Sequence, residues 1–318
     1  MTRITLALLI ALYPLLAQAS SKEDLESSKT KLNQYIRLIR ANIEKHGTQI
    51  AKSTDWNVNF IADQSIIPYA ESTNNSEGTN PKIRISSQFR LLLVYLGEMQ
   101  LIISKKRNLM KCNEEYGNYL FERMALNAKR AATSLPPLDI SAPEVFAAKI
   151  DGVCAGISKM FPLPESEEEK ITPLTYNALY FVYLHELGHI ALKHKAIGDE
   201  IFYGLTTENE KMEAFLKANV RTQHQEYAAD AWATRELIHE GATAEQLVNI
   251  PLFELLLASS GLDCQFEKAN SHPMATDRYA AIIRIILSSN ISIRPELAGA
   301  YHEFINFNKR LENSLSCP

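Results

Sequence analysis

The feature that most constrains this chain is the motif His185-Glu186-Leu187-Gly188-His189, set within a run from Leu174 to Leu192 that is apolar on nearly every helical face. Such a run predicts a buried helix. Two histidines four residues apart lie on one face of a helix, one turn from each other, so both imidazoles can reach one metal ion at about 2.0–2.1 Å. Glu186 follows the first histidine, so it can act as a general base on a water at the metal without being a ligand.

The same residues have an alternative interpretation, a core helix with two hydrogen-bonded histidines and a surface glutamate. A glutamate in a buried helix is costly unless it has a role, which favours the metal site. We expect the helix to start at Thr172 as N-cap, with Pro173 at the first helical position. His194 lies five residues beyond His189 and off the metal face, so we expect it to be a cation at the helix C-terminus.

A catalytic zinc site needs a third protein ligand and an open fourth position. The alanine-rich segment 225–233 places Glu226 and Asp230 four residues apart on one helix face, and its small residues allow a neighbour to approach closely. We predict Glu226 as the third ligand and Asp230 as the acceptor for a ring N–H of one histidine. The alternatives are an ordinary packing helix, or His224 as the ligand, although His224 faces another side of the helix.

These residues resemble the gluzincin metallopeptidases, and most closely the branch of the HtpX heat-shock, Oma and CAAX prenyl proteases. The resemblance rests on the HELGH motif, the Glu-x-x-x-Asp segment, and Ser271-His272-Pro273 with Arg278 downstream. It implies a zincin-like fold, with strands at 66–70 and 81–86 before the first core helix. A weaker likeness is to the phage-exclusion protease Lit, another small enzyme with the HExxH motif.

The chain departs from that branch by a helical insertion at about 107–165 and by lacking the branch's transmembrane helices. Its periodicity predicts a mainly α (α+β) protein with a small β-hairpin or sheet beside the metal helix. We expect strands at 56–60 and 81–86, a linker at 135–143, an acidic loop at 162–170, and helices at 22–45, 87–107, 113–132, 144–160, 172–192, 208–240, 243–258, 273–289 and 295–313. We treat residues 20–318 as one catalytic domain.

The N-terminus predicts export. Arg3 precedes an apolar stretch from Ile4 to Leu16, which is too short to span a bilayer comfortably, and Ala17-Gln18-Ala19 is a small-residue cleavage site. We therefore expect residues 1–19 to be a signal peptide, and the mature protein to be periplasmic or secreted without a stable membrane anchor. An uncleaved anchor or a buried N-terminal helix is the alternative.

Cysteine usage fits an oxidising compartment, because the four cysteines can pair. We favour Cys112–Cys154 and Cys264–Cys317, since each pair links neighbouring predicted helices, with buried free thiols as the alternative. Removal of Arg3 with the signal peptide takes the formal net charge from −4 to −5. This mild acidity, without a basic stripe, argues against a nucleic-acid partner.

The predicted function is zinc-dependent hydrolysis of proteins or peptides. Glu186 would take a proton from the attacking water and pass it to the leaving amine. The donor that meets the oxyanion would be His272, Arg278 or Tyr227; His272 stands at a helix start that favours negative charge. The strand at 81–86 would pair with an extended substrate as an edge strand.

Two other functions stay open: a secreted effector protease with a single protein target, and a non-catalytic zinc-binding chaperone or binding module in the periplasm. The presence of Glu186 argues against the second, because a structural site has no use for that base. The sequence carries no signal for cleavage specificity or oligomeric state.

Overall fold

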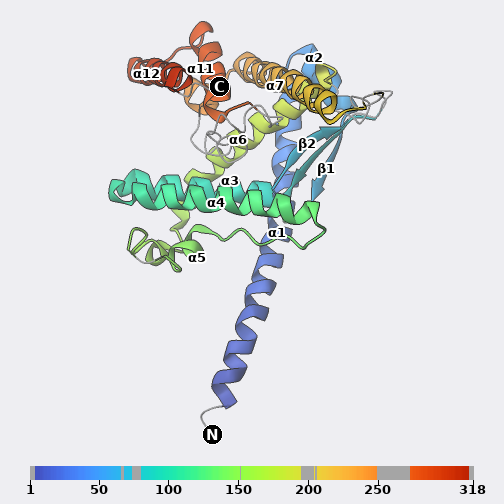
Figure 1. The fold of residues 1–318 in the computed structure, drawn as a ribbon. Helices are drawn as coiled ribbons and strands as arrows, with labels where there is room; N and C mark the ends of the chain where they lie inside the picture. The colour runs from blue at the N-terminus through green and yellow to red at the C-terminus, as the bar shows by residue number, and fades with distance from the viewer. Residues whose placement is uncertain are drawn as a thin grey trace.

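The computed structural model describes residues 4–65, 68–73, 80–150, 152–194, 204, 206–248 and 273–314. The protein is mainly helical with one small mixed sheet, as predicted (Figure 1). Its helices are α1 (Ile4–His46), α2 (Gln49–Asn57), α3 (Ser87–Lys105), α4 (Met110–Ala132), α5 (Pro143–Ala147), α6 (Glu165–Ala191), α7 (Glu208–His239), α8 (Ala244–Leu247), α11 (Ala275–Ser288) and α12 (Pro295–Ser314), with 3-10 turns η1 (Arg107–Leu109) and η2 (Ser158–Met160). The strands are β1 (Asn59–Asp63), β2 (Ala70–Thr73) and β3 (Lys82–Ser86).

The sheet has the order β1-β3-β2, so β3 is its central strand. β3 pairs in parallel with β1, where Phe60 is opposite Ile83, and antiparallel with β2, where Ser72 is opposite Ile83. Ile83 and Ile85 are fully buried, as expected for alternate residues of a strand with one face on the core. The prediction that residues 81–86 form an edge strand is therefore wrong, because β1 pairs with one side of β3 and β2 with the other.

Helix α6 lies at the centre of the molecule and packs against α1, α2, α3, α7, α8 and the strands β2 and β3 (Figure 1). It begins at Glu165 and contains Pro173 in its interior, so the predicted start at Thr172 and the predicted acidic loop are wrong. Glutamates in the first turns suit the positive end of the helix dipole. Glu167 is also bound by Lys105 and Lys170, at 2.7 and 3.2 Å.

Two further segments differ from prediction. Helix α2 takes up part of the expected strand at 56–60, and it is capped by the Thr48 side chain, which accepts a hydrogen bond from the Ala51 amide. The expected helix at 144–160 stops after α5. Gly152 and Gly156 then have φ values of +86° and +87°, a left-handed conformation that interrupts a right-handed helix.

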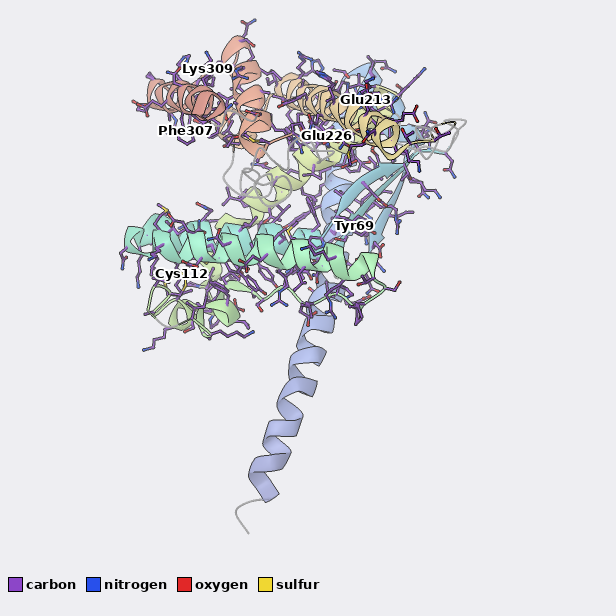
Figure 2. The ribbon with its side chains drawn as sticks, in the orientation of Figure 1. Tyr69, Cys112, Glu213, Glu226, Phe307 and Lys309 are labelled. Carbon is purple, nitrogen blue, oxygen red and sulfur yellow. A yellow bond between two sulfur atoms is a disulfide. The ribbon has the colours of Figure 1, made fainter. Side chains whose placement is uncertain are left out.

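The insertion is fastened by a disulfide. Cys112 of α4, labelled in Figure 2, is bonded to Cys154 in the segment after α5, with 5.0 Å between their Cα atoms. Both residues are buried, and this predicted pairing is confirmed. The predicted pair Cys264–Cys317 lies outside the described residues.

Within the residues that the structure describes, no helix combines the length and the apolar character needed to cross a bilayer.

Candidate metal centre

The candidate site forms where α6 and α7 approach closely. A Cβ atom added to Gly188 would lie 3.1 Å from Cε3 of Trp232 and 3.4 Å from Cα of Ala229. The absence of a side chain at Gly188 and the small side chain of Ala229 thus let the two helices meet. This contact brings Glu226 of α7 opposite the two histidines of α6.

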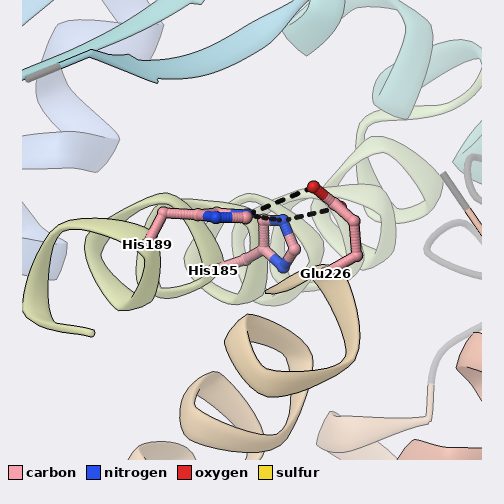
Figure 3. Close-up of side chains that lie close together, drawn as sticks. All are labelled: His185, His189 and Glu226. Atoms are coloured by element: carbon pink, nitrogen blue, oxygen red, sulfur yellow. Dashed lines mark hydrogen bonds and ion pairs between the residues drawn. The ribbon is translucent and has the colours of Figure 1, made fainter. Parts of the chain in front are cut away.

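Figure 3 shows His185, His189 and Glu226 converging from the two helices. The two Nε2 atoms are 3.0 Å apart, and Glu226 places Oε2 at 3.3 Å from Nε2 of His185 and Oε1 at 3.4 Å from Nε2 of His189. Ligand atoms at 2.0–2.1 Å from a tetrahedral ion would be about 3.3–3.4 Å apart. Two imidazoles and one carboxylate with this spacing could hold a metal ion. The structure brings the three predicted residues together, and their role as ligands stays a prediction.

Asp230 fixes the orientation of the first histidine. Its Oδ1 lies 2.8 Å from Nδ1 of His185, so the structure selects His185 as the histidine that Asp230 contacts. Burial would raise the pKa of Asp230, but Arg278 and His185 outweigh it and hold that pKa at about 2. Asp230 is therefore a charged acceptor, and a proton on Nδ1 of His185 leaves Nε2 free to bind a metal.

The site gathers buried groups that can carry charge. Glu186, Glu226 and Asp230 are buried carboxyl groups, and the guanidinium of Arg278 is buried with them. Burial disfavours an imidazolium at His185, yet Asp230 and Glu226 raise its pKa to about 10. A divalent cation with neutral histidines would balance these charges, which is the second respect in which the donor set fits a metal.

Arg278 comes from α11 and is fully engaged with the carboxylates of α7. It donates from Nε and Nη2 to Asp230 at 2.7 and 2.8 Å, and its Nη1 lies 3.5 Å from Oε2 of Glu226. Burial lowers the pKa of Arg278, but Asp230, Glu226 and Glu186 raise it above its ordinary value. The structure thus places Arg278 against Asp230 and Glu226, where it can position them, and its predicted catalytic role stays a prediction.

Glu186 is the sequence neighbour of the candidate ligand His185. It is buried, and its charge acts on Arg278. It is not among the three residues that could hold an ion. Its role as the general base stays a prediction.

His194 is the site residue whose role the sequence did not reveal. Its Nδ1 lies 2.9 Å from Nδ1 of His189, and the two rings meet edge to face. His194 therefore contacts a candidate ligand instead of lying off the metal face as expected, and burial and the neighbouring His189 lower its pKa to about 4. The left-handed conformation of Lys193 (φ +56°), which turns the chain back over the helix, is not visible in residue spacing.

The remaining candidates lie apart from this cluster or outside the described residues. His224 is exposed on α7 and is not among the residues that could hold the ion. Tyr227 is half-buried on the same helix. His272 lies outside the described residues, so its proposed oxyanion role stays a prediction.

The family model for Peptidase U49 matches residues 98–294, a span that includes α6, α7 and α11 with every residue of the candidate centre. The chain belongs to the Peptidase U49 family. As a U49 peptidase it acts on protein substrates. Of the two resemblances read from the sequence, this match supports the one to Lit. No curated protein and no solved structure matches the chain.

Proposed function

We propose that this U49 peptidase is a zinc-dependent endopeptidase whose ion is held by His185, His189 and Glu226. The observation that carries the proposal is that the two histidine Nε2 atoms lie 3.0 Å apart and that each lies 3.3–3.4 Å from an oxygen of the Glu226 carboxylate. These distances are near those between ligand atoms of one tetrahedral ion. The three buried carboxyl groups beside the histidines support it as well, because a cation would stabilise them in their charged form. When bound, zinc lowers the pKa of a water towards about 7 and polarises a carbonyl group.

The protein residues supply proton transfer, orientation of the ligands and a donor to the oxyanion. Glu186 takes the proton of the attacking water and delivers it to the amine that leaves. Asp230 orients His185 through Nδ1, and Arg278 holds Asp230 and Glu226 at the ends of its guanidinium. Because Arg278 is occupied in this way, His272 and Tyr227 are the better candidates for the oxyanion donor.

An extended substrate can be bound by strand addition at β2. This strand is at one edge of the sheet, and it packs against α6, the helix that carries both histidines. An unpaired strand edge offers backbone donors and acceptors to a peptide, as in β-augmentation. Strand β2 therefore replaces residues 81–86 as the proposed substrate strand.

The test is metal analysis of the purified protein together with hydrolysis of casein. We expect about one zinc per chain, loss of hydrolysis with a chelator, and recovery when zinc is added. His185→Ala and Glu226→Ala should each lower zinc content and activity, whereas His224→Ala, an exposed change on the same helix as Glu226, should alter neither. Full zinc and activity in Glu226→Ala would show that the third ligand lies elsewhere.

We further propose that the enzyme is exported after cleavage behind Ala19. The disulfide Cys112–Cys154 supports this, because such bonds persist in oxidising compartments. Among the described side chains of α1, the buried ones begin at Ser28. Cleavage would therefore leave intact the face by which α1 packs on α3 and α6.

A further inference from the structure

We propose that His194 positions His189 for metal binding by accepting a hydrogen bond from the Nδ1–H of His189. The inference rests on the proposed function, in which His189 is a ligand. It adds a residue that has no place in the ligand set, in proton transfer or among the oxyanion candidates. His194 touches the ligand and not the reacting atoms, so it is a positioning residue.

The direction of this hydrogen bond follows from the geometry of His189. Its Nε2 faces the site, 3.0 Å from Nε2 of His185 and 3.4 Å from Oε1 of Glu226. A ring nitrogen that binds a metal must present a lone pair, so the ring proton of His189 belongs on Nδ1. At 2.9 Å from Nδ1 of His194, that proton has an acceptor. His194 must then be neutral at Nδ1, with its own proton on Nε2.

The two proposed histidine ligands thus have neighbours of different charge at Nδ1. Nδ1 of His185 lies 2.8 Å from the carboxylate of Asp230, whereas Nδ1 of His189 faces an uncharged imidazole. The site already contains three buried carboxylates, so a fourth in place of His194 would upset the balance reached with a divalent cation. A neutral acceptor orients the second ligand without adding charge.

The backbone conformation at the end of α6 places His194 beside the ring of His189. α6 ends at Ala191, and Lys193 then takes a left-handed conformation with φ of +56°. The amide of His194 donates to the carbonyl of His189 at 2.9 Å, which closes the turn. The chain therefore folds back, and the ring of His194 meets the ring of His189 with centroids 4.9 Å apart.

The test compares His194→Asn with His194→Leu, two side chains of similar size that differ in having an acceptor. The amide oxygen of asparagine can take the place of Nδ1, whereas leucine offers nothing. Zinc affinity is measured by competition with a chromophoric chelator. We expect His194→Leu to weaken zinc binding about 10- to 100-fold and His194→Asn to retain most of the affinity.

Two variants of the preceding residue test the turn. Lys193→Gly suits a left-handed conformation and should preserve zinc affinity. Lys193→Val is disfavoured there, so it should displace His194 and weaken binding as His194→Leu does. Thermal unfolding of the zinc-free variants shows whether each change acts on the site or on the fold.

The outcomes separate the inference from the function on which it rests. Weakening that is equal in His194→Leu and His194→Asn, or absent from both, overturns the positioning role. If His189→Ala keeps full zinc affinity, the proposed ligand set fails. If His189→Ala loses zinc while His194→Leu does not, only the role of His194 fails.

Discussion

Arg278 and Asp230 form a buried bidentate pair between α11 and α7, with Nε 2.7 Å from Oδ2 and Nη2 2.8 Å from Oδ1. The same Asp230 carboxylate lies 2.8 Å from Nδ1 of His185. One carboxylate therefore connects a C-terminal helix to a candidate metal ligand. The pair has a structural consequence as well as a functional one, because each partner compensates the buried charge of the other.

Replacement of Arg278 tests this connection. Arg278→Met leaves Asp230 buried without its main cation, so we expect a loss of about 3–5 kcal/mol in the free energy of unfolding and weaker zinc binding. Urea unfolding, with and without zinc, measures the first effect. The control is Arg294→Met, which removes an exposed pair with Glu245 and should cost at most about 1 kcal/mol. Equal stability of the two variants would contradict the role given to Arg278.

The general base can be removed without removing the metal. Glu186→Gln should keep wild-type zinc content, because Glu186 is not among the three residues that could hold the ion. Hydrolysis of casein should fall by about 10²–10⁴-fold, since the amide cannot accept the proton of the attacking water. Glu213→Gln, an exposed change on α7, should have no effect. Undiminished turnover by Glu186→Gln would rule out the mechanism.

The close contact of α6 and α7 should be sensitive to volume at Gly188. A valine there would press on the Ala229 backbone and the Trp232 ring, so Gly188→Val should push α7 away and lower zinc affinity. The matched control is Gly117→Ala in α4, where an added Cβ meets nothing within 4 Å and should stabilise the helix by about 0.5–1 kcal/mol. Unchanged zinc binding in Gly188→Val would mean that the close contact of α6 and α7 does not position Glu226.

The disulfide should contribute to stability rather than to the metal centre. Replacing Cys112 and Cys154 together by serine should lower the free energy of unfolding by about 2–5 kcal/mol, because the unfolded chain is no longer constrained. Zinc affinity should change little, since both cysteines belong to the insertion. Urea unfolding in oxidising and reducing buffer gives the comparison. If the urea midpoint of the wild-type protein were the same in oxidising and reducing buffer, the expected contribution of the disulfide would be contradicted.

Export predicts a defined mature N-terminus. Intact-mass measurement of the protein from the periplasm or medium should give a chain that begins at Ser20, with two fewer hydrogens for the Cys112–Cys154 bond. Changing Ala17 and Ala19 to bulky residues should block cleavage. Recovery of the wild-type protein with Met1 retained would refute cleavage behind Ala19.

The local pattern of residues was sufficient for much of the helical framework. The bounds expected for α7, α11 and α12 agree closely with the structure, and the spacing of His185 and His189 alone placed both on one face of α6. Helical periodicity depends on neighbours three and four residues apart, so it can be read along the chain. The pairing of Cys112 with Cys154 was also predicted from the neighbouring segments that carry them, although Cys154 lies after α5 and not in the helix expected at 144–160.

Tertiary structure decided how these elements meet. Whether Asp230 contacts His185 or His189, and whether Arg278 faces a substrate or a carboxylate, depends on how α6, α7 and α11 pack. The central place of β3 depends on pairing with two strands that both precede it in the chain, β1 and β2. The role of His194 depends on one left-handed residue. Such contacts join groups far apart in sequence or follow from a single backbone angle, and neither leaves a periodic signal in the sequence.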